Sequence, residues 1–312
     1  MNNMNRHKPA LPYAAASMAV LLFALSPTAQ ADVDISATSG SGPNGFSSTE
    51  VRGNADLFTT PLSVNALHFK SDSSTADAIT QSALGLKWKA SKLATLGVTH
   101  NTQDSSLINI SGNAISLALA LQTLWDSKLQ TRLDLKRGAS EYQFNGLPAP
   151  YNTSNQTANT LGLSQDIAEP VTLYVSLDRY SYDKDPKQSA FHMMKVTRLR
   201  FFSTASNLLS FPDSTNTYGM TWRPLEALSV DLSSSNTSTQ LDQKLKTRRL
   251  GLDYQATDHL YITAAISRVS ATAVVTKKTI FPMIPALTIP AGTTVMPATN
   301  DTYREIGLGW MF

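Results

Sequence analysis

Cysteine is missing from this 312-residue chain, and charged residues make up only 16% of it. Without cysteine there is no disulfide framework, no thiolate zinc site and no cysteine nucleophile. After residue 31 there is no run of about 18 uncharged apolar residues, which excludes an ordinary membrane-spanning helix there. Hydrophobic residues nevertheless make up 42%, which is too many for a disordered chain and enough for a large folded structure.

Motifs for catalysis and cofactor binding are missing as well. There is no HExxH motif, no glycine-rich phosphate loop, and no cluster of histidines and carboxylates at metal-ligand spacing. The histidines beyond residue 31 are His68, His100, His192 and His259, and frequent Ser and Thr give any of them a nearby hydroxyl by chance. We therefore expect no enzyme, no catalytic residue, no metal and no cofactor, with a histidine-based site as the alternative.

The first 31 residues have the three parts of a secretory signal peptide. Arg6 and Lys8 give a basic start, an apolar run covers 13–25, and Ala-Gln-Ala at 29–31 is a small-x-small cleavage site. The apolar run is short for a stable span, and an uncleaved anchor is the alternative. Cleavage would leave 24 of the 26 basic residues against 23 acidic ones, so we expect no nucleic-acid partner.

The remaining residues, 32–312, alternate between apolar and polar side chains. From Ile115 to Leu121 every odd position is apolar, and the even positions are small or polar. The same alternation recurs in 128–137, 171–178 and 260–266. Successive side chains of a strand point to opposite faces, so these segments predict strands with one apolar face and one polar face.

We predict fourteen strands, an even number, which places both chain termini on the periplasmic side with the short turns. They cover 33–39, 46–56, 62–71, 81–90, 94–101, 113–124, 128–137, 157–166, 171–181, 212–222, 227–236, 246–254, 259–270 and 302–312. Two alternatives remain open. Residues 32–60 alternate poorly and would leave twelve strands if unpaired, whereas a hairpin within 193–202 would make sixteen.

The connections between the predicted strands are unequal. Short turns are expected at 57–61, 91–93, 125–127, 167–170, 223–226 and 255–258, and longer loops at 102–112, 138–156, 182–211, 237–245 and 271–301. Short turns at one end and long loops at the other are typical of a transmembrane antiparallel up-and-down β-barrel. In hydrocarbon only a helix or a closed barrel satisfies the backbone polar groups. We therefore predict an all-β fold with residues 32–312 as one barrel.

Aromatic residues gather beside the short turns. Trp88, Trp125, Trp222 and Trp310 lie next to such a turn or at the C-terminus, and Tyr254 does too. Trp and Tyr carry an apolar ring and a polar group, and therefore favour a membrane–water interface. We expect all five at one rim of the barrel; core tryptophans at strand ends are the alternative.

The last strand resembles the C-terminal strand of Gram-negative outer-membrane β-barrels. Its residues Ile306, Leu308, Trp310 and Phe312 alternate with other side chains, and the chain ends on an aromatic ring. In those porin-like proteins this strand is the assembly signal. The LGLDYQ and LGLSQD segments loosely resemble barrels of exopolysaccharide operons. The resemblance implies the cell outer membrane, with outer-membrane lipids, the barrel assembly machinery, periplasmic chaperones and periplasmic export components as partners.

The polar faces predict the side chains that line a pore. These are Lys87, Lys89, Lys128, Arg132, Asp134, Lys136, Tyr174, Asp178, Asp231, Arg249, Asp253, Tyr261 and Glu305. Because their charges nearly cancel, we expect no strong ionic selectivity. Lys128, Arg132 and Lys136 predict a local basic ladder or, alternatively, a wall that is salt-bridged to neighbouring strands.

The sequence thus predicts a channel for polar solutes or a secreted polymer such as exopolysaccharide. The apolar segment 280–289 leaves open an importer of hydrophobic small molecules. A third interpretation is a barrel without a transport function, which would act as an adhesin or as a structural or assembly partner. A long apolar, proline-rich loop should not lie bare in water. We expect 182–211, 271–301 or both to fold inward as a constriction or pack on the rim; a hairpin above the membrane is the alternative.

Overall fold

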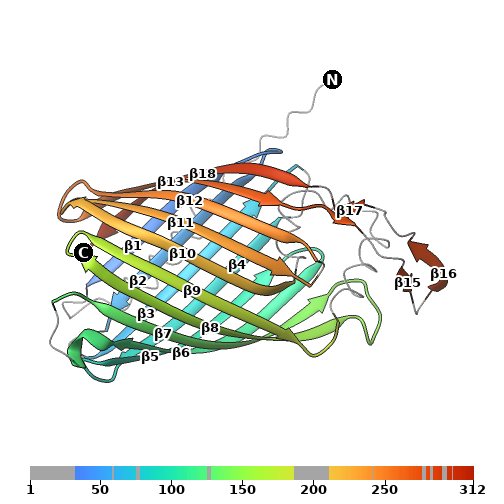
Figure 1. The fold of residues 1–312 in the computed structure, drawn as a ribbon, viewed down its shortest axis with the longest axis horizontal. Helices are drawn as coiled ribbons and strands as arrows, with labels where there is room; N and C mark the ends of the chain where they lie inside the picture. Colours follow the sequence, from blue (N-terminus) through green and yellow to red (C-terminus); the bar gives the residue numbers. More distant parts are fainter. Residues whose placement is uncertain are drawn as a thin grey trace.

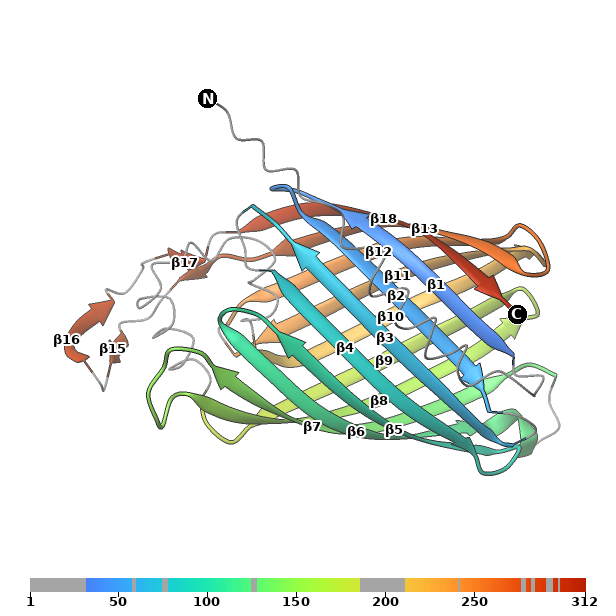
Figure 2. The same cartoon turned by 180° about the vertical axis from the view of Figure 1, so that it is seen from behind.

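The computed structural model describes residues 32–57, 60–74, 78–124, 128–185, 211–240, 242–275, 279–281, 284–289, 294–296 and 298–312. Fourteen antiparallel strands form a closed barrel within these ranges (Figures 1 and 2). Neighbouring strands follow chain order, and β18 closes the ring between β13 and β1. No helix in the described ranges is long and apolar enough to cross a bilayer. The predicted fold class and strand number are confirmed.

The strand bounds agree with the predicted segments except between β6 and β7, where 121–124 and 128–130 were predicted as strand and are a 3-10 turn and part of the connection. The barrel consists of β1 (Val33–Ser41), β2 (Ser47–Asp56), β3 (Leu62–Asp72), β4 (Ile79–Lys89), β5 (Ala94–Asp104), β6 (Ile108–Ala120), β7 (Thr131–Phe144), β8 (Thr153–Ala168), β9 (Val171–Tyr182), β10 (Pro212–Leu225), β11 (Leu228–Thr239), β12 (Lys244–Gln255), β13 (Leu260–Ala271) and β18 (Thr299–Met311). A 3-10 turn, η1 (Leu121–Leu124), follows β6. Between β13 and β18 lie β14 (Val274–Val275), β15 (Thr279–Phe281), β16 (Ile284–Ile289) and β17 (Thr294–Met296).

The first strand closes the barrel although its sequence alternates poorly. Ile35 pairs with Trp310 of β18 on one side and with Gly53 of β2 on the other. Small residues occupy both faces of β1 and β2, which weakens the alternation, but ladder hydrogen bonds depend on the backbone and not on the side chains. The twelve-strand alternative is therefore wrong, and the segment 193–202 lies outside the described residues.

Several strands are longer than predicted at the long-loop end. The connections expected at 102–112 and 237–245 shrink to 105–107 and 240–243. Asn109 still pairs with Gln143 in this region, where both strands are polar on the outside. The outward side chains here are polar, whereas inward ones such as Ile108 and Phe144 pack in an apolar cluster. The pattern of the belt, apolar outside and polar inside, is thus reversed, and the sequence resembled a loop although backbone pairing continued. The long connections that remain are 183–211 and 272–298.

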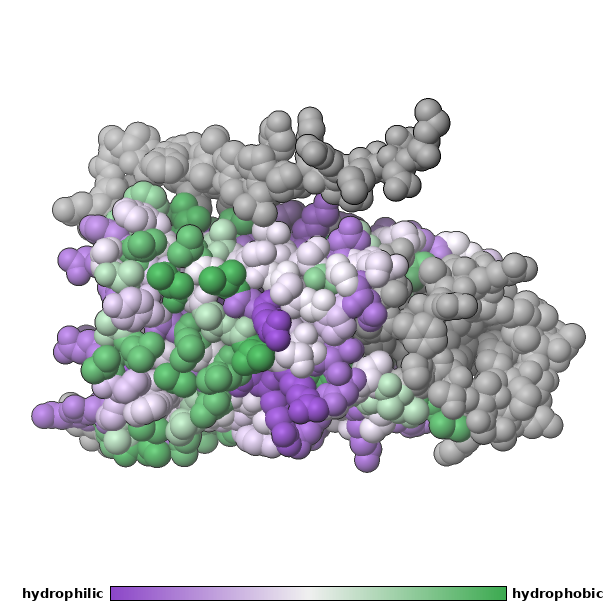
Figure 3. Space-filling view, turned by 90° about the horizontal axis from the view of Figure 1, so that it is seen from above, coloured by the Kyte–Doolittle hydropathy of each residue, from purple (hydrophilic) through white to green (hydrophobic). Residues whose placement is uncertain are grey.

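On the side of the barrel seen in Figure 3, the outer face is mostly apolar in the half nearer the short turns and more hydrophilic toward the long loops. On β9 the outward side chains Leu173, Val175 and Leu177 are 38–42% exposed, and Arg179 follows them. A soluble protein would cover such a continuous apolar surface. The belt therefore has the character of a surface that contacts hydrocarbon.

The aromatic rim follows the prediction where it is described. Trp88, Trp222, Trp310 and Tyr254 are 44–49% exposed and lie on outward positions near the short turns. His259, in the turn before β13, stacks on Trp310 with ring centroids 6.0 Å apart. Trp125 lies outside the described residues. These rings mark the edge at which the apolar belt meets water.

We predict that Leu163→Arg, in the middle of the β8 part of the belt, lowers the free energy of unfolding in lipid vesicles by about 2–4 kcal/mol, because a charge then faces hydrocarbon. The matched control is Asn159→Arg, on the same strand and face but above the belt, which should cost less than about 1 kcal/mol. Urea titration followed by tryptophan fluorescence measures both. Equal losses for the two variants would contradict the placement of the belt.

Candidate functional site

The barrel interior is the candidate site because its wall carries most of the chemically active side chains. The predicted lining residues on strands alternate with the outward apolar positions and face the interior: Lys87, Lys89, Arg132, Asp134, Lys136, Tyr174, Asp178, Asp231, Arg249, Asp253, Tyr261 and Glu305. Lys128 is the exception, since it lies in the turn before β7. That the wall residues line a conducting pore stays a prediction.

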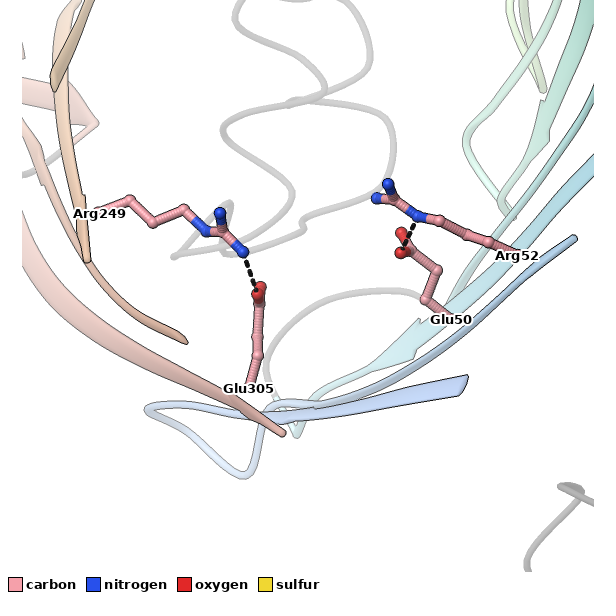
Figure 4. A network of polar contacts seen from close by, with 4 residues as sticks. All are labelled: Glu50, Arg52, Arg249 and Glu305. Carbon is pink, nitrogen blue, oxygen red and sulfur yellow. Dashed lines mark hydrogen bonds and ion pairs between the residues drawn. The ribbon is translucent and has the colours of Figure 1, made fainter. Parts of the chain in front are cut away.

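A polar cavity of about 540 Å³ lies against the interior of β1, β2, β12, β13 and β18. Two ion pairs project into it from opposite sides (Figure 4). Arg249 Nη2 lies 3.3 Å from Glu305 Oε2, and Arg52 pairs with Glu50. All four side chains are partly exposed, so each pair contributes about 1 kcal/mol or less to stability, but together they fix charged groups at a wet surface.

The sequence did not assign Asp34, Glu50, Arg52 and Asp301 to the interior wall. The first three belong to the poorly alternating strands β1 and β2, and Asp301 lies at the outer end of β18, where the pattern had been interpreted as loop. Register settles their orientation, because Asp34 pairs with Met311 on the interior face. These residues add more carboxylates than bases, and the interior is therefore more acidic than predicted.

Apart from the ion pairs Arg52–Glu50, Arg132–Asp134 and Arg249–Glu305, interior charges are separated across the barrel. Lys87 and Lys89 on β4 and Lys136 on β7 lie on one wall, while Asp231 and Asp253 lie on β11 and β12. In the ring order, the β5–β6 side is opposite the β12–β13 side, so the basic and acidic walls face each other. This arrangement produces an electric field across the lumen, and a charged or dipolar solute would orient in it.

The predicted basic ladder on β7 is interrupted. Arg132 binds Asp134 on the same strand, with Nη2 2.8 Å and Nε 2.9 Å from Oδ1. The expected alternative, a salt bridge to a neighbouring strand, is not present for Arg132 in the described part of the chain. Its charge is thus largely neutralised locally, which leaves Lys136 as the remaining interior basic group of that strand.

Two interior tyrosines each pack against a glycine of the neighbouring strand, and we call each of these tyrosine–glycine contacts a joint. Tyr174 of β9 pairs with Gly219 of β10, and Tyr261 of β13 pairs with Gly309 of β18. In both cases the ring lies against the glycine, where an added Cβ would clash with it. Each ring thus covers a position that has no side chain, which supports register in a curved sheet.

Each joint ends on a carboxylate one strand further. Tyr174 Oη donates to Asp231 Oδ2 at 3.0 Å, and Tyr261 Oη donates to Asp34 Oδ1 at 2.8 Å. The carboxylates belong to similar sequences, Val-Asp-Leu-Ser at 230–233 and Val-Asp-Ile-Ser at 33–36. The two joints hold interior acids in fixed positions on the acidic wall.

An apolar cluster occupies the interior at the long-loop end. Phe211 is fully buried, with ring centroids 5.7 Å from Tyr142, 5.8 Å from Phe144 and 6.0 Å from Tyr182. Its φ is +45°, a conformation that is unfavourable for a bulky side chain. The packing of the ring compensates this strain. Phe211 therefore fixes the point at which the 183–211 connection rejoins the barrel.

Both long connections contribute to this mouth cluster, which we define as Ile108, Tyr142, Phe144, Phe211 and Val274. Val274 belongs to the start of the 272–298 connection and is 6% exposed. The expectation that these loops approach the lumen therefore holds at their roots. Their remaining parts are described only for β15, β16 and β17.

The β15–β16 hairpin does not enter the barrel. It lies beyond the mouth in both views, at the far end from the chain terminus C (Figures 1 and 2). Its two strands pair with each other, Thr279 with Ile289. For β15 and β16, the inward fold expected for 271–301 is thus replaced by the hairpin alternative, because strand pairing satisfies their backbone without the barrel.

The start of the 183–211 connection is tied to the β7–β8 hairpin. Asp183 accepts hydrogen bonds from the Asn155 N–H at 2.7 Å and from the Asn155 amide at 2.8 Å. Burial raises the pKa of Asp183, but these hydrogen bonds lower it by more, so the pKa lies below its ordinary value. Lys184 Nζ donates to the Pro150 and Thr153 carbonyls at 3.3 and 3.1 Å. The connection therefore leaves the barrel in a fixed direction.

The histidines do not form a catalytic arrangement. His68 Nδ1 lies 3.0 Å from Ser82 Oγ, and His100 Nδ1 lies 2.9 Å from Asn113 Oδ1, both on the outer face. In the described part of the chain His68 has no hydrogen bond to a carboxylate that would orient it as a base. No group of three potential metal ligands occurs among the described residues either. His192 lies outside them.

Known structures with a similar barrel include several channels. The CymD monoaromatic hydrocarbon channel is 8% identical with a TM-score of 0.49, covering 92% of this chain and 90% of its own. OccK3 (OpdO) of Pseudomonas aeruginosa is 9% identical with a TM-score of 0.44, covering 90% and 95%. The KdgM porin, solved with disordered oligogalacturonate, is 6% identical with a TM-score of 0.42, covering 89% and 99%. No protein-family model and no curated protein matches the sequence.

We predict that Tyr261→Ala destabilises the barrel by about 2 kcal/mol, because the ring no longer covers Gly309. Tyr261→Phe keeps the ring, loses the hydrogen bond to Asp34, and should cost about 1 kcal/mol. The control is Tyr254→Phe, on the outer face near the short turns. Urea unfolding in vesicles measures all three, and equal stability of Tyr261→Ala and wild type would exclude the joint as a stabilising contact.

Proposed function

We propose that residues 32–312 form a channel for polar solutes in the outer membrane of a Gram-negative bacterium. The observation that carries this proposal is the division of the wall into an apolar outer belt and a charged, hydroxyl-rich interior on the same strands. Such two-faced strands are stable only with hydrocarbon outside and water inside. A signal peptide at 1–31, export, and assembly through Ile306, Leu308, Trp310 and Phe312 are parts of the same proposal.

The interior supports hydrophilic substrates. Its polar cavity carries both charge signs and several hydroxyl groups, and Tyr261 and Phe69 add ring surfaces to the cavity lining. Polar groups combined with aromatic rings suit sugars, which present hydroxyls and apolar C–H faces. We therefore favour neutral or weakly charged saccharides, including a secreted polymer, within the class of polar solutes.

Import of hydrophobic small molecules is the second candidate, and the mouth cluster is the observation in its favour. Phe144 and Phe211 could receive an apolar compound at the long-loop end. Below them, however, such a compound would meet the polar cavity with Arg52, Arg249 and Glu305. Removing water from those charges is costly, so a hydrophobic compound would have to leave sideways through the barrel wall. The described strands pair with their neighbours all around the barrel and leave no such opening.

Planar bilayers containing the refolded protein test the proposal. We expect stepwise conductance in KCl with a weak preference for cations, because interior carboxylates outnumber interior bases among the described strand residues. Asp231→Asn combined with Asp253→Asn should shift the reversal potential toward anions. The absence of conductance at all voltages, with correctly folded protein, would favour the non-transport interpretation.

A separate prediction concerns the mouth cluster. Phe211→Ala should increase single-channel conductance and should also lower the free energy of unfolding, by about 3 kcal/mol, because it removes a ring from a fully packed site. The control is Phe69→Ala, at an interior position against the polar cavity. Unchanged conductance in Phe211→Ala would show that the cluster is not a constriction.

A further inference from the structure

The upper edge of the apolar belt, on the long-loop side, carries arginines. The first outward residue above the belt is arginine on β7, β9, β12, β13 and β18, namely Arg137, Arg179, Arg248, Arg268 and Arg304. On no described barrel strand is this residue aspartate or glutamate. The opposite edge of the belt carries tryptophan, tyrosine and aliphatic side chains instead. The two edges of the belt therefore differ in charge.

Three of these arginines gather on neighbouring strands. Arg248 and Arg268 stand directly opposite each other in the β12–β13 register, and Arg304 lies diagonally across from Arg268 on β18. Like charges opposite one another destabilise a sheet. Within the described chain none of these guanidinium groups has an ion pair with a carboxylate; Arg268 Nε donates to the neutral Asn300 Oδ1 at 2.8 Å. An anion between the arginines would remove the repulsion.

A groove on the outer wall runs below the same arginines. It has a volume of about 970 Å³, and Lys246, Arg248 and Arg268 lie at its upper part. Its apolar lining consists of Leu173, Met220, Leu232, Leu250 and Ile266. A basic head and an apolar floor on one surface are complementary to an amphiphile with an anionic head and acyl chains.

A second groove repeats this combination on the other side of the barrel. It has a volume of about 830 Å³, and its apolar wall, which includes Leu135, Leu161 and Leu177, ends at Arg137 and Arg179. These two arginines flank Asn159 in the sheet register. The combination of arginine pair and apolar groove is thus not confined to one patch.

We propose that the groove at Lys246, Arg248 and Arg268, with Arg304 beside it, binds the phosphate groups and acyl chains of a phosphorylated glycolipid in the outer leaflet. Guanidinium groups bind phosphate in bidentate fashion, and they do so strongly next to a low-dielectric surface. The like-charged register, the apolar floor and the restriction of arginines to one edge all point to this occupant. The site rests on the membrane placement of the belt in the proposed function.

The test measures lipid binding of the refolded barrel in detergent by native mass spectrometry. The probes are a bisphosphorylated, acylated glucosamine disaccharide and its dephosphorylated form. We expect wild type to prefer the phosphorylated lipid at least about tenfold, and Arg248→Gln with Arg268→Gln to lose that preference. The control, Lys92→Gln with Arg223→Gln, removes two cations near the short turns and should keep it.

Two results would overturn the site: equal binding of both lipids by wild type, or an unchanged preference in the double glutamine variant. If that variant does not fold, as judged by heat-dependent gel mobility, the single variants Arg248→Gln and Arg268→Gln replace it. Each removes one of the two facing guanidinium groups, and a wild-type preference in both would equally reject the proposal. Conductance in phosphatidylcholine bilayers is measured separately, so a failed channel and a failed lipid site are distinguishable.

Discussion

The whole structure depends on the need to pair every backbone N–H and C=O where no water is available. A hydrocarbon environment imposes this need, and a sheet meets it only by closing on itself. Closure here requires that β1, a strand of small and polar residues, bind both β18 and β2. Once the ring is closed, the side chains are free to divide between two environments. The belt, the interior wall and the mouth are consequences of that division.

The outer surface is itself divided along the barrel axis. Nearer the short turns it is apolar, and its edge is aromatic; nearer the long loops it is hydrophilic, and the boundary carries arginines (Figure 3). On β9 the apolar outward side chains extend from Val171 to Leu177, which corresponds to about 20 Å along the strand. Much of each long strand therefore extends beyond the belt on the loop side. There, backbone hydrogen bonds to the neighbouring strands maintain the strand structure without contact to hydrocarbon.

The interior combines fixed charge with an apolar cluster at its long-loop end. Tyr174 and Tyr261 each bridge a glycine and a carboxylate, so that acids on one wall are held opposite the lysines of the other. At the mouth, Phe211 keeps a strained backbone because three aromatic rings surround it. A polar passage below an aromatic mouth suits solutes that have both hydroxyl groups and apolar faces, and this is the physical basis of the preference for saccharides.

The sequence by itself determined the strands, their two faces, and the aromatic rim, because alternation and turn residues are local properties. It therefore placed Lys87, Asp231, Arg249 and most other interior residues on the correct face. Only the tertiary structure decided how far β6, β7 and β11 continue as strands at the long-loop end, since the alternation of the belt is reversed in β6 and β7 there and absent in β11. It also decided which residues meet across strands. Tyr261 and Asp34 are 227 positions apart, and Arg248 faces Arg268 only through register, so no local pattern carries either contact.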